Sequence, residues 1–221
     1  LVMPEGSTDD IIDTAAHEVA HRFIGEALPG VPVWLNEGFA TYLETVSVEQ
    51  DAVKFGIRPI AVASLAAANQ VMPFRELVSA RHEDFHRASV SRSYAGAWVV
   101  VHWLLNGEGG ALNGRFIKLA MALRGTERDP TASLKAFAAV FPDVPLEGID
   151  ARIAAHAYKV MGSGAQAVLQ RPFKRQERPA PRVEPADPEV VKTVCQRLME
   201  QPGIGKMATG PQPGKGAVVG G

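Results

Sequence analysis

Residues 17–21 read His-Glu-Val-Ala-His, with two histidines four positions apart. Four residues advance an α-helix by slightly more than one turn, so both imidazoles leave the same face and can meet one metal ion. Glu18 follows the first histidine and can reach a water molecule bound to that metal. The pattern therefore predicts a helix that binds a metal and holds a carboxylate beside it.

The sequence around this motif marks where the helix begins and ends. Residues 7–10 read Ser-Thr-Asp-Asp, which offers an N-cap and an acidic first turn. Pro29 and Gly30 interrupt the helical pattern, so we expect the helix to end near Ala27.

A third ligand is predicted in the stretch Trp-Leu-Asn-Glu-Gly-Phe-Ala at residues 34–40. A turn through Pro29 and Pro32 would bring a second helix, expected over 36–48, back antiparallel to the first. Glu37 at its start would then meet the two histidines. Catalytic zinc sites often have two histidines and one glutamate as ligands, with the fourth position left for water. In structural zinc sites, four protein ligands normally fill every position.

The segments HEVAH and WLNEGFATYLE together resemble the gluzincin metallopeptidases, and are closest to the peptidase-MA-like and alanyl-aminopeptidase families. The resemblance implies one zinc ion on His17, His21 and Glu37, with Glu18 as general base and acid. It also implies a mainly α, zincin-like catalytic domain of the thermolysin C-terminal type over residues 1–165. Related folds place a β-sheet before the metal helix, and we expect that sheet to be missing from this fragment.

The same resemblance suggests roles for further side chains. It makes Asn36, Thr41 and Glu44 candidates for orienting a ligand histidine, since Thr41 and Glu44 share the helical face of Glu37. In such enzymes a phenol often steadies the oxyanion, and Tyr94, which begins an apolar helix expected over 94–105, is our candidate. A packing role in the wall of a cleft is the alternative for Tyr94.

A second string of the same form, His-Glu-Asp-Phe-His, occupies residues 82–86. Asp84 places a charge inside it, and Arg81 and Arg87 flank it. No third-ligand motif follows. We therefore expect a solvated helix or loop there, and leave the function of His82 and His86 open.

The composition is that of an ordinary globular protein, with 221 residues of which 46% are hydrophobic and 21% charged. The net charge of −1 gives no general attraction to nucleic acid or to an anionic membrane. A single cysteine excludes an intrachain disulfide framework and a thiolate-rich zinc site. The longest apolar run is too short for a membrane-spanning helix.

The last part of the chain differs in composition from the rest. Residues 171–221 hold nine Lys and Arg against five Asp and Glu, and eight of the sixteen prolines. We expect residues 166–221 to form a largely disordered basic tail, with a short helix over 188–200. In the body, further helices are expected over these ranges: 60–69, 111–123, 131–140 and 146–160. Residues 32–35 suit an extended segment, and His102 suits a buried core position.

These observations predict a zinc metallopeptidase that acts on a peptide or protein substrate. The alternatives are a catalytically inactive zincin-fold module for binding or assembly, and a metal-free helical domain with a coincidental motif. The sequence leaves open the cleavage specificity, the choice between exo- and endopeptidase, the oligomeric state and the compartment. The resemblance leans toward bacterial proteins exported or membrane-anchored through an upstream segment.

Overall fold

The computed structural model describes residues 8–48, 52–57, 59–87, 89–162, 169–172 and 189. The chain divides into two units, Glu5–Arg175 and a second made of Leu1–Pro4 with Gln176–Gly221. Every named helix and strand lies in the larger unit.

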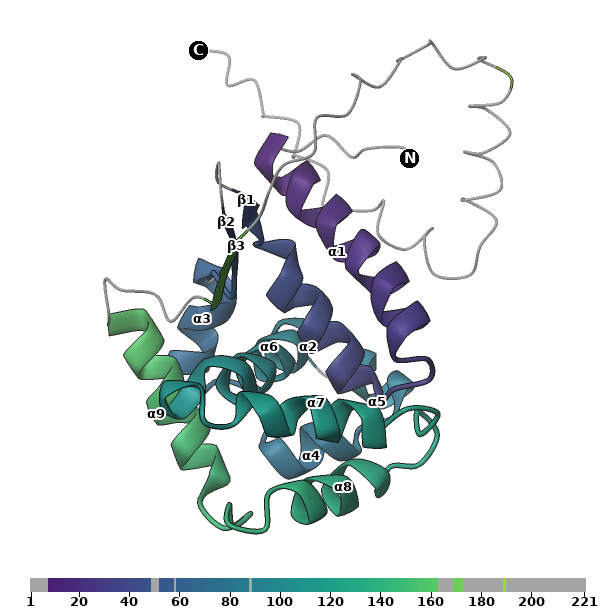
Figure 1. The fold of residues 1–221 in the computed structure, drawn as a ribbon, viewed down its shortest axis with the longest axis vertical. Coiled ribbons are helices and arrows are strands. Elements are labelled where there is room, and N and C mark those ends of the chain that lie inside the picture. The colour runs from purple at the N-terminus through teal and green to yellow at the C-terminus, as the bar shows by residue number, and fades with distance from the viewer. Residues whose placement is uncertain are drawn as a thin grey trace, which may run out of the picture. The chain divides into compact units, whose positions relative to one another are not determined.

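The described part of the larger unit is mainly helical, as the sequence predicts (Figure 1). Its helices are α1 (Thr8–Ala27), α2 (Val33–Glu44), α3 (Ile60–Ala67), α4 (Phe74–Ser79), α5 (His82–Arg87), α6 (Val90–Asn106), α7 (Asn113–Ala122), α8 (Ala132–Val140) and α9 (Ile149–Gly162), with a 3-10 turn, η1 (Gly107–Gly110). The strands β1 (Ser47–Val48), β2 (Ala52–Phe55) and β3 (Leu169–Pro172) form an antiparallel sheet in that order.

Helix α2 joins α1 to the core. It packs most extensively on α6 on one side and on α1 on the other. Gly38 makes the α6 contact close, because a Cβ atom there would lie 2.5 Å from the carbonyl oxygen of Ala97. The two backbones approach within a distance that no other residue at position 38 would permit.

Helix α6 supplies the centre of the core. Of the residues from Ser93 to Leu105, all except Tyr94 are buried. Trp98, Trp103 and Leu104 are among the least exposed side chains of the larger unit. A helix that is apolar on every face must be surrounded by other elements, and α6 contacts α2, α3, α4, α5, α7 and α9.

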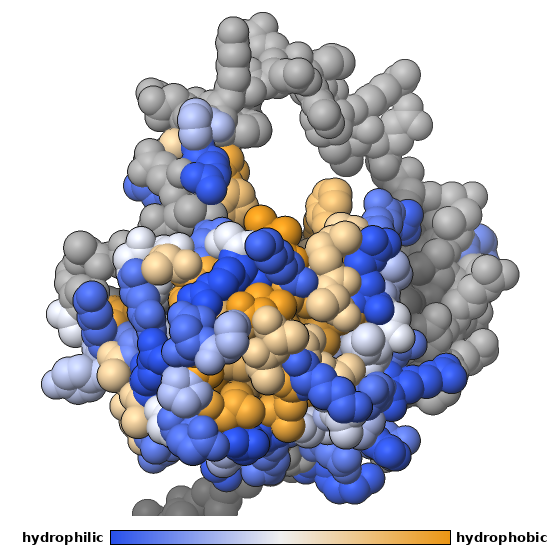
Figure 2. Space-filling model, turned by 60° about the horizontal axis from the view of Figure 1, so that its bottom comes forward, coloured by the Kyte–Doolittle hydropathy of each residue, from blue (hydrophilic) through white to orange (hydrophobic). Residues whose placement is uncertain are grey.

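Helices α4 and α8 close one side of this core. The Phe74 and Phe137 rings meet edge to face with centroids 5.1 Å apart, and Phe137 stacks on Phe141 at 4.8 Å. On this side the surface has an apolar centre bordered by hydrophilic side chains (Figure 2). The three rings are at most 2% exposed, so this aromatic packing belongs to the interior.

The structure differs from the sequence-based expectation between residues 32 and 55. The expected extended segment at 32–35 is wrong, because Pro32 caps α2 and the helix already begins at Val33. Pro32 lacks the N–H that the cap position would leave unpaired, so it suits a helix start. Helix α2 also ends at Glu44 rather than near Val48, since the chain turns there into β1.

Two further differences concern the tail. Residues 169–172, which the composition assigned to the tail, form β3 and pair with β2, with Arg171 opposite Val53. The helix expected over 188–200 lies outside the described residues apart from Glu189. None of the helices in the described ranges combines the length and apolar character needed to cross a membrane.

Candidate metal centre

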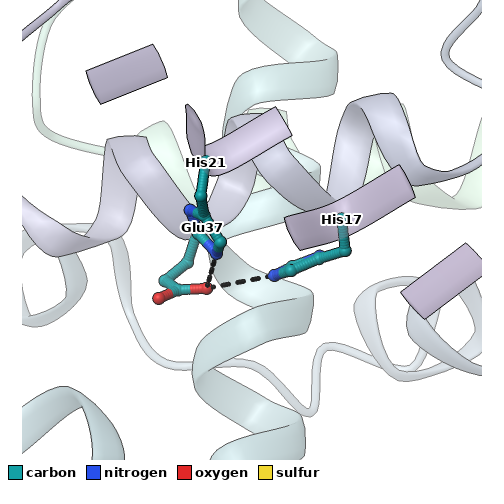
Figure 3. Close-up of side chains that lie close together, drawn as sticks. All are labelled: His17, His21 and Glu37. Atoms are coloured by element: carbon teal, nitrogen blue, oxygen red, sulfur yellow. Dashed lines mark ion pairs between the residues drawn. The ribbon is translucent and has the colours of Figure 1, made fainter. Parts of the chain in front are cut away.

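The two histidines of the first motif and the predicted carboxylate come together from α1 and α2. His17 and His21 lie one turn apart on α1, with ring centroids 4.7 Å apart. Oε2 of Glu37 lies 3.4 Å from Nε2 of His17 and 3.5 Å from Nε2 of His21 (Figure 3). All three side chains therefore point at one small volume.

Two of the three distances between these atoms are close to those of a tetrahedral zinc site. Zn–N and Zn–O bonds of about 2.0–2.1 Å separate neighbouring ligand atoms by roughly 3.3 Å. The two Glu37 distances lie close to that value, and the three ligand atoms all fall within 4.8 Å of one another. Oε2 of Glu37 is buried and makes no hydrogen bond to any described residue, which leaves it available to a metal ion.

The outer nitrogens of the two imidazoles are held by polar side chains of α2. Nδ1 of His17 lies 2.8 Å from Oε2 of Glu44, and Nδ1 of His21 lies 3.1 Å from Oδ1 of Asn36. Both acceptors require a proton on Nδ1, which leaves the Nε2 lone pairs free to face the metal position. The hydroxyl of Thr41, the third residue expected to orient a histidine, is buried and makes no hydrogen bond to any described residue.

The ionisable groups of this site shift one another's pKa values. Burial works against a charge on His17, but the carboxylates of Glu37 and Glu44 outweigh it and raise its pKa to about 9. Burial likewise opposes ionisation of Glu37, yet the two histidines hold its pKa well below the usual range. A divalent cation would displace the proton on Nε2 of His17, so metal binding should release that proton.

Two further candidate residues flank the site. Tyr94, near the start of α6, is half-buried with its ring centroid 6.3 Å from that of His17. Burial raises the pKa of Tyr94, and the charges of Glu37 and Glu18 add to the effect, so the phenol stays a neutral donor. Glu18 is exposed on α1, beside the ligand His17.

The second histidine string forms a wall beside this centre. A cavity of about 700 Å³ is lined by Asn36 and Glu37 on one side and by α5 residues that include His82 and Glu83 on another. The sequence predicts a solvated segment here, and His82 and Glu83 are indeed exposed. What the sequence analysis misses is Phe85, which is fully buried with its ring centroid 5.4 Å from that of Tyr94 and so fixes α5 beside the site.

Residues 10–122, about half of the chain, match the family described as "Protein of unknown function (DUF1570)". The chain belongs to the DUF1570 family. No curated protein and no solved structure matches it. The part that matches DUF1570 contains the three candidate ligands, the residues that orient them, Tyr94 and both histidines of α5.

Proposed function

We propose that the chain is a zinc-dependent peptidase of the gluzincin type with a zincin-like fold. The observation that carries the proposal is the meeting of His17, His21 and Glu37 around one point, with the exposed carboxylate of Glu18 next to a ligand. Three ligands leave a tetrahedral cation one open position, which a catalytic centre needs and a structural one lacks.

The donor set favours zinc over calcium and magnesium. Two imidazole nitrogens and one carboxylate oxygen suit a borderline-soft cation, whereas calcium and magnesium prefer oxygen ligands. When bound, zinc lowers the pKa of a coordinated water to about 7 and polarises a carbonyl group.

The carboxylate of Glu18 is the proton carrier in the proposed reaction. It accepts a proton from the attacking water and delivers that proton to the amine that leaves as the peptide bond breaks. Because the Glu18 side chain is exposed, both the attacking water and the leaving amine can reach it. The substrate is accordingly a peptide or protein that reaches the cavity between Glu37 and α5.

Tyr94 is the donor to the developing oxyanion. Its raised pKa keeps the hydroxyl protonated across the working pH range of a peptidase. A neutral donor aimed at an oxyanion typically contributes about 3 kcal/mol to transition-state stabilisation. Because Tyr94 is half-buried against Phe85, its ring is already held in place before substrate binds.

The test combines metal analysis with a cleavage assay on the full chain. We expect about one equivalent of zinc in the purified protein, and cleavage of members of a mixed peptide library that stops when a chelator removes the metal. Zinc without cleavage would instead favour the inactive binding or assembly module. Absence of any bound zinc would refute the metal centre itself.

A further inference from the structure

Helix α5 presents a second pair of histidines in the arrangement that binds metal on α1. His82 and His86 are four residues apart, and their ring centroids lie 4.3 Å apart. The corresponding separation of His17 and His21 is 4.7 Å. Both pairs therefore bring two imidazoles to one side of a helix at a spacing that a single cation can bridge.

The ring nitrogens of this second pair are available. Among the described residues, neither imidazole makes a hydrogen bond or an ion pair, in contrast to His17, His21, His102 and His156. His82 is exposed and His86 is half-buried.

The charges on α5 leave the histidine face open to a cation. Arg87 pairs with Glu83 at 3.8 Å and with Asp84 at 3.3 Å, so its charge is balanced on the neighbouring face of the helix. Arg81 precedes His82 and makes no ion pair among the described residues, and its charge will weaken the binding of a cation.

We propose that His82 and His86 bind a second divalent transition-metal cation, separate from the centre on α1 and α2. Among the described residues, the group with the spacing of a three-ligand site is His17, His21 and Glu37. The site on α5 therefore has two protein ligands, and water molecules complete its coordination. Such a site exchanges its metal readily and binds it more weakly than the three-ligand centre.

The position of the pair gives this site a consequence for the cavity. His82 lines the same cavity as Glu37, and the His86 ring centroid lies 6.1 Å from that of Tyr94. A bound cation would add two positive charges to the α5 wall. The positive charge on this side of the cavity would then increase with the concentration of free zinc. This effect does not depend on whether the first centre hydrolyses peptides.

The experiment is a calorimetric titration of ZnCl₂ into the metal-stripped full chain. We expect two classes of site, the second weaker by on the order of a hundredfold. His82→Asn and the double variant His82→Asn/His86→Asn should lose the weaker class and keep the tighter one. His17→Asn should lose the tighter class and keep the weaker one.

Asp84→Asn is the matched control, because it removes a charge from the same helix without touching either imidazole, and it should retain both classes. Because His82 is exposed, its replacement should leave the fold intact. A single class of site in the unaltered chain would overturn the proposal. So would a weaker class that survives in the double variant.

Discussion

Nδ1 of His17 lies 2.8 Å from Oε2 of Glu44, the residue seven positions beyond Glu37 on the same helix. Seven residues are two helical turns, so Glu37 and Glu44 share a face of α2. They meet opposite nitrogens of one imidazole, Glu37 near Nε2 and Glu44 at Nδ1. Helix α2 therefore both completes the ligand set and fixes the tautomer of a ligand on α1.

This contact predicts that Glu44→Ala will weaken zinc binding without abolishing it. Loss of a carboxylate that orients a ligand histidine typically costs about 10- to 100-fold in metal affinity. The measurement is competition with a zinc-binding dye at fixed pH. Glu26→Ala is the control, since Glu26 is exposed on α1 and pairs with Arg22, away from the histidines. Equal affinities for the Glu44 and Glu26 variants would contradict the orienting role.

Glu18→Gln should separate metal binding from catalysis. The amide is the same size but cannot accept and return a proton, so we expect unchanged zinc content and a loss of turnover of at least about 100-fold. Zinc analysis and the peptide assay on the same sample provide both readouts. Near-normal turnover in this variant would remove Glu18 from the mechanism.

Tyr94→Phe should lower turnover by on the order of 100-fold while leaving the zinc content and the Michaelis constant little changed. The reason is that the hydroxyl is expected to act on the oxyanion and not on the metal. The control is Tyr158→Phe, which removes a hydroxyl from an exposed ring on α9. If the Tyr94 variant instead loses stability and keeps its turnover, the alternative role in the cavity wall is correct.

The residues of the candidate metal centre could be proposed from sequence because helical periodicity is local. The four-residue spacing of His17 and His21 fixes their common face, and a short turn constrains where Glu37 can lie. The Ser-Thr-Asp-Asp stretch at residues 7–10 likewise predicts a helix start there, and α1 begins at Thr8.

The missed features depend on contacts between segments far apart in the chain. The sheet joins Ala52–Phe55 to residues more than a hundred positions later, and its strands are too short to show an alternating pattern. The place of α5 depends on one buried residue, Phe85, inside an otherwise charged stretch. The partner of His102 likewise lies on a helix 54 residues away.

That histidine pair predicts a loss of stability in acid. Nε2 of His102 donates to the carbonyl oxygen of Gly56 at 3.1 Å, so its Nδ1 must accept the 2.8 Å hydrogen bond from Nε2 of His156. Both rings are thus neutral, and burial lowers the pKa of each to about 4. In the unfolded chain both would titrate near pH 6.5.

Between pH 6.5 and 4 the unfolded state therefore binds more protons than the folded state, and the free energy of unfolding falls as the pH falls. His156→Gln keeps an N–H donor toward His102 but removes one titrating group. Its free energy of unfolding should fall less steeply in this range, by up to about 1.4 kcal/mol per pH unit. Urea unfolding of both proteins at pH 7, 6 and 5 measures the difference between their free energies of unfolding. The contributions of His17 and His21 cancel in this difference because both proteins contain them. Parallel curves for the two proteins would show that folding does not lower the pKa of His156.

Gly38→Ala tests the close crossing of α2 and α6. A Cβ atom at position 38 would lie 2.5 Å from the carbonyl oxygen and 2.7 Å from the carbonyl carbon of Ala97, both backbone atoms that cannot rotate away. The helices would have to separate, at a typical cost of about 1–3 kcal/mol, which exceeds the gain of roughly 1 kcal/mol from the better helix propensity of alanine. Because Glu37 is the preceding residue, zinc affinity should fall as well.

Gly25→Ala is the matched control within α1, because nothing lies within 4 Å of the position that the alanine methyl group would take. That variant should be neutral or slightly more stable, since alanine favours the helix and meets no obstacle. Chemical denaturation of the two variants beside the unaltered chain gives the comparison. A Gly38 variant as stable as the Gly25 variant would mean that α2 and α6 can move apart freely, and the position of Glu37 would then have to be set by its contacts with α1.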